Sequence, residues 1–397
     1  MLRPSMNRDR LGGPFVVQAT DVSAGEAIGF SQRLEVTMNG PKLLCVLVLV
    51  LLGGPARAAT MTAHFIDVGQ GAATILEFSC GAVLIDSGGE QRNGVFEGRE
   101  KFEDYVRKFF TDRPQFEGKF GLIVLSHPHQ DHIWFVSSLK NSVGDYPTAA
   151  VVDNAKRFFP LSNNNQKKLR DWALENAIHL GVVVDDISDD GITDGAMDPF
   201  DCSGVDPKFS AIWGRTVPEP DHWSSEAFHN PNNHSVVLRV DFGAASFLLL
   251  GDLEKAGELD MTVKYDGSDM LEVDVVQASH HGAENGTSQL LLDMSTPKLI
   301  VVPVGNLDRK YKPFSAWDHG HPTSSAMARF VDKVTCTRAP KTIKIASDSE
   351  PDPSEVESMQ IEKAIYLTGY DGDLRVIADS NGTYEIESDA GLNDTCP

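Results

Sequence analysis

The chain has 397 residues, 41% of them apolar, so it can bury a substantial core and is not expected to be disordered. Its formal net charge of −22 argues against a surface that gathers nucleic acid through phosphate contacts, although it does not exclude a local basic groove. The length allows one large domain or two small ones.

The first predicted element is a secretory signal at residues 38–58. Lys42 precedes an apolar run at residues 43–52, and Ala56-Arg57-Ala58 has the small side chains of a cleavage site. The run is only about half of the roughly 20 residues that a membrane-spanning helix needs. We therefore expect cleavage after Ala58 and no membrane span in the mature protein, which would be periplasmic or secreted.

The 37 residues before this signal need a separate interpretation, because a signal peptide stands at the start of a chain. We interpret residues 1–37 as a misassigned start or a disordered leader, with translation beginning at Met38.

Export would place the four remaining cysteines in an oxidising compartment, where an even number suggests disulfides. These cysteines are Cys80, Cys202, Cys336 and Cys396. Three pairings are open, and we favour Cys336 with Cys396, which would tie down the C-terminus.

From Thr60 the chain is predicted to form short strands joined by tight turns, at residues 62–68, 74–78 and 82–85. The glycines that follow, Gly88 and Gly89, permit positive φ and close backbone approach. Residues 95–111 have apolar and aromatic side chains at helical spacing, which predicts an amphipathic helix.

A histidine-rich loop then follows the apolar run at residues 122–125, which predicts a buried strand. The loop reads Ser126-His127-Pro128-His129-Gln130-Asp131-His132, and Pro128 keeps it from coiling into a helix. Three imidazoles and one carboxylate within six residues suit zinc, and also iron or manganese. The loop therefore predicts a metal centre at the end of a strand.

Beyond the loop the pattern alternates between helices and strands. Helices are expected at residues 131–139, 164–179 and 324–334, and strands at residues 149–152, 235–242, 245–250, 273–277, 298–304 and 374–378. Residues 185–233 are rich in Asp, Pro, Gly and Ser and are expected to form a long excursion over the active site rather than a separate domain.

Six motifs in order resemble the metallo-β-lactamase superfamily, and within it the branch that includes the hydrolase domain of the competence protein ComEC. The match spans roughly residues 61–380 and implies an α/β fold, a four-layer αββα sandwich, for a hydrolase domain at residues 59–397. The motifs are the loop at residues 126–132, two before it at residues 64–71 and 83–89, and three after it at residues 232–238, 247–252 and 278–282.

The resemblance implies two divalent metal ions, zinc first with manganese or iron as alternatives, and a metal-bound hydroxide as the attacking group. By resemblance, six side chains would hold the two ions. His127 and His129 would hold the first ion, Asp131, His132 and His280 the second, and Asp252 would bridge them.

The predicted catalytic residues are Asp131 and His281, with His281 as a donor or acid near the substrate oxygen. His280 is preferred over His281 as the ligand because it ends the run that derives from a strand. Asp67 and Asp86 are expected to orient ligand imidazoles through their free N–H groups, with a turn-capping role as the alternative for each.

The sequence departs from the superfamily pattern at Asn232-Asn233-His234. Most members have another histidine for the first metal at this place, whereas the ComEC-like branch commonly has asparagine. Either Asn232 or a neighbour lines the site, or His234 restores the missing ligand.

The functional prediction is an exported metal-dependent hydrolase that cleaves phosphodiester bonds, as a nuclease or as a phosphodiesterase on a small molecule or polymer. The charge does not favour nucleic acid as the substrate. A lactam or lactone hydrolase on the same site is one alternative, and a catalytically inactive binding protein with the same fold is another. The sequence leaves the substrate, the native metal and the oligomeric state open.

Overall fold

The computed structural model describes residues 58–140, 145–155, 165–182, 191–193, 195–347, 353 and 355–397. The predicted leader, and the predicted signal apart from Ala58, lie outside these residues. Within the described part of the chain, no helix has both the length and the apolar character that a membrane crossing needs.

The first sheet has nine strands and is antiparallel at one end and parallel at the other, with the change at β3. Its fully apolar β6 is buried along its whole length, because packing covers both faces of the sheet there. The order is β19 (Asn393–Cys396), β18 (Tyr384–Ser388), β17 (Leu374–Asp379), β1 (Thr60–Phe65), β2 (Thr74–Phe78), β3 (Gly81–Ile85), β6 (Leu122–Val124), β7 (Ala150–Asp153) and β8 (His179–Val182).

The second sheet has six strands, four of them parallel. The order is β16 (Ile365–Leu367), β13 (Leu299–Val302), β12 (Val275–Gln277), β11 (Ala245–Leu249), β10 (Val237–Phe242) and β9 (Lys208–Trp213). Two small hairpins lie apart from these sheets, β14 (Thr337–Ala346) with β15 (Val356–Lys363) and β4 (Gln91–Arg92) with β5 (Phe96–Glu97).

The two sheets share one apolar core, because successive side chains of a strand point to opposite faces. In β2, Leu76 belongs to the core that also contains Leu238 and Phe247 of the second sheet. Its neighbour Ile75 belongs to a second cluster together with Phe102. The sheets therefore pack face to face, with helices outside.

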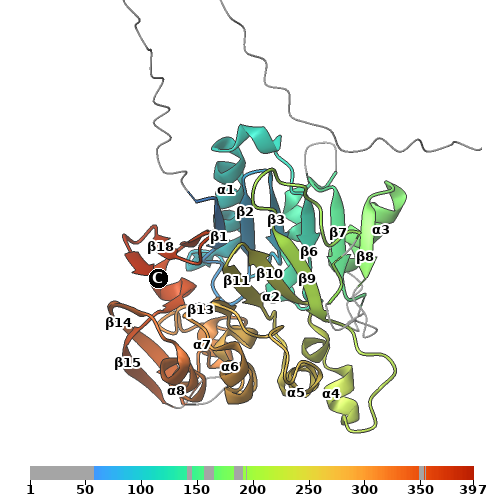
Figure 1. Cartoon of the computed structure of the whole chain (residues 1–397). Coiled ribbons are helices and arrows are strands. Elements are labelled where there is room, and N and C mark those ends of the chain that lie inside the picture. The colour runs from blue at the N-terminus through green and yellow to red at the C-terminus, as the bar shows by residue number, and fades with distance from the viewer. Residues whose placement is uncertain are drawn as a thin grey trace, which may run out of the picture. The chain divides into compact units, whose positions relative to one another are not determined.

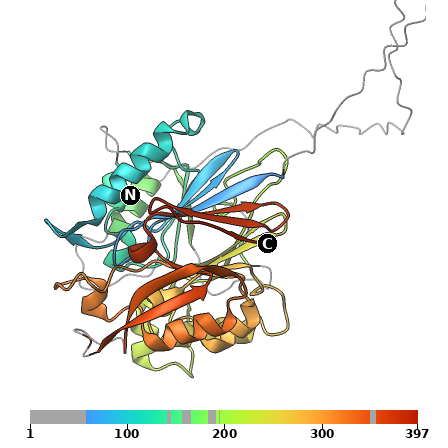
Figure 2. The same cartoon turned by 90° about the vertical axis from the view of Figure 1, so that its left-hand side faces the viewer.

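Helices cover the outer face of each sheet (Figures 1 and 2). On the first sheet α1 (Gly98–Thr111) buries Phe102, Val106 and Phe109, which recur at helical spacing. The helix α8 (Ser324–Lys333), below the second sheet, is capped by Thr323, whose side chain accepts a hydrogen bond from the Ala326 N–H. The predicted four-layer αββα sandwich is confirmed.

The remaining helices are all shorter than α1. They are α2 (Gln130–Ile133), α3 (Asn165–Glu175), α4 (Ser225–His229), α5 (Lys255–Lys264), α6 (Gln289–Ser295), α7 (Ala316–His319) and α9 (Thr368–Asp371), with 3₁₀ turns at Pro114–Phe116, Val136–Leu139, Pro231–His234 and Ser279–Gly282.

Three expectations differ from the structure. The helix expected at residues 131–139 is α2 followed by a 3₁₀ turn, and the helix expected at residues 164–179 ends at Glu175, so that His179 opens β8. The excursion expected at residues 185–233 also contains β9, which pairs with β10 as the edge of the second sheet.

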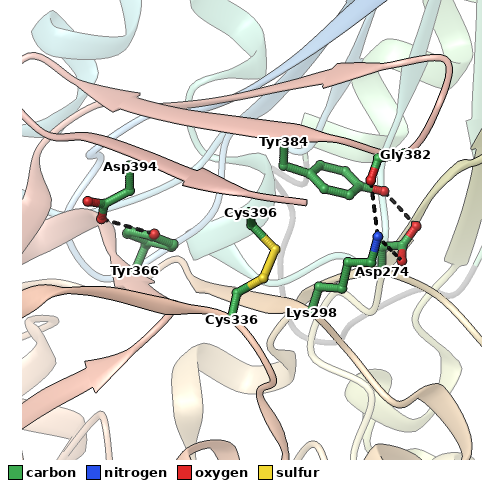
Figure 3. Close-up of a disulfide and its surroundings, with 8 residues drawn as sticks. All are labelled: Asp274, Lys298, Cys336, Tyr366, Gly382, Tyr384, Asp394 and Cys396. Atoms are coloured by element: carbon green, nitrogen blue, oxygen red, sulfur yellow. Dashed lines mark hydrogen bonds and ion pairs between the residues drawn. A yellow bond between two sulfur atoms is a disulfide. The ribbon is translucent and has the colours of Figure 1, made fainter.

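A disulfide and two side-chain hydrogen bonds, together called the clamp, join the C-terminal strands of the first sheet to the second sheet and its surroundings (Figure 3). The disulfide Cys336–Cys396 confirms the favoured pairing, and the other two cysteines form Cys80–Cys202. Beside it Tyr384 Oη donates to Asp274 Oδ2 at 2.6 Å, and Tyr366 Oη donates to Asp394 Oδ2 at 3.1 Å. Covalent and polar contacts thus fix the two sheets at this end.

Candidate metal centre

The candidate metal centre lies where parallel strands of both sheets end. The histidine loop follows β6, and Asp86 follows its parallel neighbour β3. Asp252 comes after β11, and His281 comes after β12, which pairs with β11 in parallel. Because the carboxyl ends of parallel strands meet at one edge, each sheet delivers part of the site.

Asp86 fixes the start of the histidine loop. Its Oδ1 accepts the Ser126 N–H and its Oδ2 accepts the Ser126 hydroxyl, both at 2.7 Å. His132 Nδ1 also donates to Asp86 Oδ2 at 2.7 Å, which directs His132 Nε2 into the site. Asp86 therefore orients the imidazole of His132, which is a predicted ligand.

Asp67 does not orient a ligand imidazole. Its Oδ1 accepts the Gly69 N–H at 3.1 Å, and its Oδ2 accepts a bond from Lys101 Nζ at 2.7 Å. This is the turn-capping alternative, with an added ion pair.

The loop can lie against the end of β3 because Gly88 has no side chain. A Cβ atom at Gly88 would be 2.2 Å from the backbone carbon of Asp131. The glycine is therefore needed for close approach and not for a positive φ.

Four side chains form a compact group with one ligand atom each, all within 4.8 Å of one another. His132 Nε2 is 2.9 Å from Asp252 Oδ1, and His281 Nε2 is 3.3 Å from Asp131 Oδ2 and 3.4 Å from Asp252 Oδ1. The group consists of Asp131, His132, Asp252 and His281.

This donor set fits a divalent metal ion. His132 Nδ1 donates to Asp86 and His281 Nδ1 donates to the Pro303 carbonyl, so each neutral ring leaves an unprotonated Nε2. These two Nε2 atoms face each other at 3.3 Å, and Asp252 Oδ1 is buried without a hydrogen-bond donor. Four inward-facing ligand atoms, with the Nδ1 of each ring already bonded outside the group, are the chemistry of a cation site.

The carboxylates of the group also favour a positive charge at this place. Burial alone would lower the pKa of His132 and of His281, but the Asp252 carboxylate outweighs it, with Asp86 assisting at His132 and Asp131 at His281. The pKa of His132 is raised well above its usual value, and that of His281 is raised to about 9. A metal ion would supply this charge in place of the protons.

His127 and His129 lie on the other side of Asp252. His127 Nε2 is 3.8 Å from Asp252 Oδ2 and 3.1 Å from His129 Nδ1. Burial is the main cause that lowers the pKa of both imidazoles, so both are neutral and able to bind a metal. Asp252 thus turns one oxygen to each side, which is the arrangement of the predicted bridging ligand.

The predicted choice between His280 and His281 is reversed in the structure. His281 joins the compact group, whereas His280 Nδ1 contacts Asn285 Oδ1 at 2.9 Å and is 3.6 Å from Glu254 Oε1. The cause is a turn after β12 in which both residues have positive φ, 48° and 54°, so the order along the strand does not decide which ring points inward. The structure therefore places His281, and not His280, beside the other candidate ligand atoms.

Asn232 and His234 are the two candidates in the motif that departs from the superfamily pattern. Both ring nitrogens of His234 are hydrogen-bonded to other groups. Its Nδ1 accepts the Thr216 N–H at 3.0 Å, and its Nε2 donates to the Phe228 carbonyl at 2.7 Å. Asn232 is 4% exposed, and its Oδ1 has no hydrogen-bond partner.

Part of the rim of the site consists of residues to which the sequence assigned no role. Gln70 Nε2 lies 3.1 Å from His321 Nδ1, and the His321 ring lies 5.2 Å from the ring of His280. The segment that bears His321 is anchored by the buried Glu90, which accepts bonds from the Ala316 N–H and the Tyr311 hydroxyl, both at 3.0 Å. Two signals were available, the motif at residues 64–71 that contains Gln70 and the dipeptide His321-Pro322, whereas an isolated Glu carries none.

A family model described as the metallo-beta-lactamase superfamily matches residues 66–305, more than half of the chain. ComE operon protein 3 of Bacillus subtilis is 23% identical over 277 residues, covering 68% of this chain and 32% of that protein. Recombination protein 2 of Haemophilus influenzae is 22% identical over 302 residues, covering 75% of this chain and 31% of that protein. The chain thus spans about a third of the length of these curated relatives.

Among solved structures, the metallo-beta-lactamase fold protein YhfI of Bacillus subtilis aligns with a TM-score of 0.37 and 10% sequence identity. The alignment covers 76% of this chain and all of YhfI. The sequence relatives confirm the predicted resemblance to the competence-protein branch.

Proposed function

The chain belongs to the metallo-β-lactamase superfamily, whose members are generally metal-dependent hydrolases, and from this membership we propose an exported phosphodiesterase with a dinuclear metal site. The observation that carries the proposal is the position of Asp252, with one oxygen beside His132 and His281 and the other toward His127. A carboxylate with ligand imidazoles on both sides suits two ions, and zinc is the first choice for such a set, with manganese or iron as alternatives.

The residues of the chain perform distinct tasks in this proposal. Two divalent ions bound here would lower the pKa of a water molecule and neutralise charge that develops on the substrate oxygens. Asp86 and the Pro303 carbonyl hold the rings of His132 and His281 in their ligand tautomers. His280, whose side chain is 21% exposed, is the histidine of the pair that a substrate can reach.

A phosphodiester is favoured over a lactam or lactone because two ions about a bridging carboxylate suit in-line displacement at phosphorus. The net charge of −22 favours a small molecule or a short polymer over long nucleic acid. A binding protein without turnover would be expected to have lost a ligand, and the six side chains of the predicted ligand set, with His281 in place of His280, are all present.

The disulfides support export. All four cysteines of the described chain are paired, in Cys80–Cys202 and Cys336–Cys396. Stable disulfides are typical of proteins outside the reducing cytosol. A periplasmic or secreted protein is therefore the location that we propose.

The test is hydrolysis of bis(p-nitrophenyl) phosphate, a single-stranded oligonucleotide and a chromogenic cephalosporin by the full chain loaded with zinc or manganese. We expect phosphodiester cleavage that is lost in His127→Ala and kept in His222→Ala. His222 is the matched control because its side chain is 62% exposed and pairs with Asp260 at the surface. Cleavage of the cephalosporin alone would overturn the substrate class, and no turnover of any substrate would favour the binding protein.

A further inference from the structure

A series of neighbouring aromatic rings leads from the buried His281 of the metal centre to half-buried side chains at its rim. The centre of the His281 ring lies 6.3 Å from that of His321, which lies 5.9 Å from that of His319. The rings of His319 and Phe314 meet edge to face at 5.5 Å, and those of Phe314 and Trp134 do so at 6.0 Å. We call the rings of Trp134, Phe314, His319 and His321 the ring wall.

Two separate segments hold the ring wall in place. Trp134 stands two residues after His132, where α2 ends. Phe314 and His319 flank α7, and the Phe314 N–H donates to Asp318 Oδ2 at 2.8 Å. Phe314 has a φ of +71°, which is rare for a bulky side chain. The backbone therefore keeps Phe314 in an unfavourable conformation that sets its ring between Trp134 and His319, and such strain is typical of functional sites.

The ring wall is uncharged and carries unpaired ring nitrogens. Burial lowers the pKa of His319, and Asp131 is the carboxylate that opposes this most, so the imidazole is neutral and lies near Asp131. His319 Nε2 is buried without a hydrogen-bond partner, and within the described residues the indole N–H of Trp134 makes no hydrogen bond either. An unpaired ring nitrogen costs free energy unless a ligand meets it, and half-buried aromatic rings leave surface for a flat ligand.

We propose that the ring wall binds a planar heteroaromatic ring of the substrate, which one of the two ester groups of the scissile phosphodiester carries. Trp134 and Phe314 pack against this ring, and a nitrogen of His319 forms a hydrogen bond with a polar atom at its edge. The proposal rests on the phosphodiesterase proposed above and names the substrate class of that site. Recognition here uses stacking and not basic residues, which agrees with the net charge of −22.

The test compares two phosphodiesters with the same leaving group, thymidine 5′-(p-nitrophenyl) phosphate and ethyl p-nitrophenyl phosphate, on the full chain loaded with zinc or manganese. We expect kcat/KM to be about fivefold or more higher for the thymidine ester, through a lower KM. Trp134→Ala should remove most of this preference, and Trp134→Tyr should keep most of it. His319→Phe, which keeps a ring but not the nitrogens, should raise KM for the thymidine ester about 2- to 10-fold.

Trp172→Ala is the matched control. Trp172 is also half-buried, but its Nε1 donates to Asp145 Oδ1 at 3.3 Å and its ring lies 5.1 Å from that of Tyr146, away from the ring wall. This variant should show the same ratio of the two kcat/KM values as the wild type.

Tryptophan fluorescence gives a readout that does not depend on turnover. Thymidine 5′-monophosphate, which has no diester bond, should quench the emission saturably, and ribose 5-phosphate, which has no aromatic ring, should not. The quenching should be lost in Trp134→Phe and kept in Trp172→Phe, because only Trp134 would contact the bound ring.

Equal kcat/KM for the two esters in the wild type, or a preference that survives in both Trp134→Ala and His319→Phe, would overturn the inference. Failure of the proposed function is distinguishable from this. Saturable quenching at Trp134 without cleavage of either ester would refute the phosphodiesterase and leave the ring wall as a binding site, and cleavage without preference or quenching would do the reverse.

Discussion

Asp86 connects the first sheet to the metal centre through three hydrogen bonds to Ser126 and His132. In Asp86→Asn one acceptor oxygen becomes an amide nitrogen, which leaves at least one buried donor without a partner. We expect metal affinity to fall about 10- to 100-fold and the free energy of unfolding to fall by about 1–3 kcal/mol. Chelator competition and chemical unfolding measure the two effects.

Asp67→Asn is the control for this prediction, since Asp67 contacts Gly69 and Lys101 and no ligand imidazole. Its metal affinity should equal that of the wild type. An equal loss of metal in both variants would show that Asp86 acts through general stability and not through the orientation of His132.

The buried carboxyl of Asp373 should make the free energy of unfolding depend on pH, independently of the metal centre. Burial, with the nearby carboxylates Asp389 and Asp67, raises its pKa to about 6. The folded protein therefore holds this proton more tightly than the unfolded chain does. The stabilisation is present below the unfolded pKa of about 4 and is lost as the pH rises through 6.

Asp373→Asn imitates the protonated carboxyl and keeps an oxygen that can accept the Asp67 N–H. We expect the variant to be more stable than the wild type at pH 7.5, by up to about 2 kcal/mol, with no difference at pH 3.5. Urea unfolding at the two pH values measures this. A difference that does not change with pH would mean that folding does not raise the pKa of Asp373.

At the scale of elements, local sequence patterns predicted most strands and helices of the core. They did not predict the segments whose positions are decided by tertiary packing. The apolar β6 and the histidine loop were predicted because strand, proline and ligands adjoin in sequence. The edge strand β9 was missed because Pro, Asp and Gly on both sides of it dominate the pattern of residues 185–233. Its pairing with β10 is a tertiary contact that local propensity does not encode.

The residues of the candidate site also divide into those that the local sequence predicts and those that it does not. Asp252 at the end of a strand could be placed from sequence, whereas the choice between His280 and His281 depends on two successive positive φ angles. The Pro303 carbonyl that fixes His281 is at the end of a different strand, β13. No pattern of side chains near residue 280 reveals that partner.

The C-terminal strands are predicted to depend on the Cys336–Cys396 disulfide. The bond closes a separation of 60 residues, and its loss frees the unfolded chain more than the folded one. The double variant Cys336→Ser/Cys396→Ser should lower the free energy of unfolding by about 2–5 kcal/mol. Its metal content should stay at the wild-type level, because none of the clamp residues is a ligand. Metal loss in parallel with the loss of stability would contradict this separation.

At the scale of the whole molecule, the metal centre needs both sheets. Asp131 and His132 follow a strand of the first sheet, and Asp252 and His281 follow strands of the second. An ion bound to all four stabilises the packed sheets by mass action, about 2.7 kcal/mol at a free concentration 100 times Kd. EDTA treatment should therefore lower the melting temperature, and zinc should restore it. An unchanged melting temperature would mean that the ligands do not share one ion.

The net charge of −22 governs how a long anionic substrate approaches. A protein that gathers nucleic acid with basic residues loses affinity as salt is added, because counterion release is weakened. Here the repulsion between the acidic surface and a polyanion should be screened instead. From about 20 to about 200 mM salt, kcat/KM should rise for an oligonucleotide of roughly 20 nucleotides and stay constant for bis(p-nitrophenyl) phosphate. A steep fall for the oligonucleotide alone would reveal a local basic groove and make nucleic acid the favoured substrate.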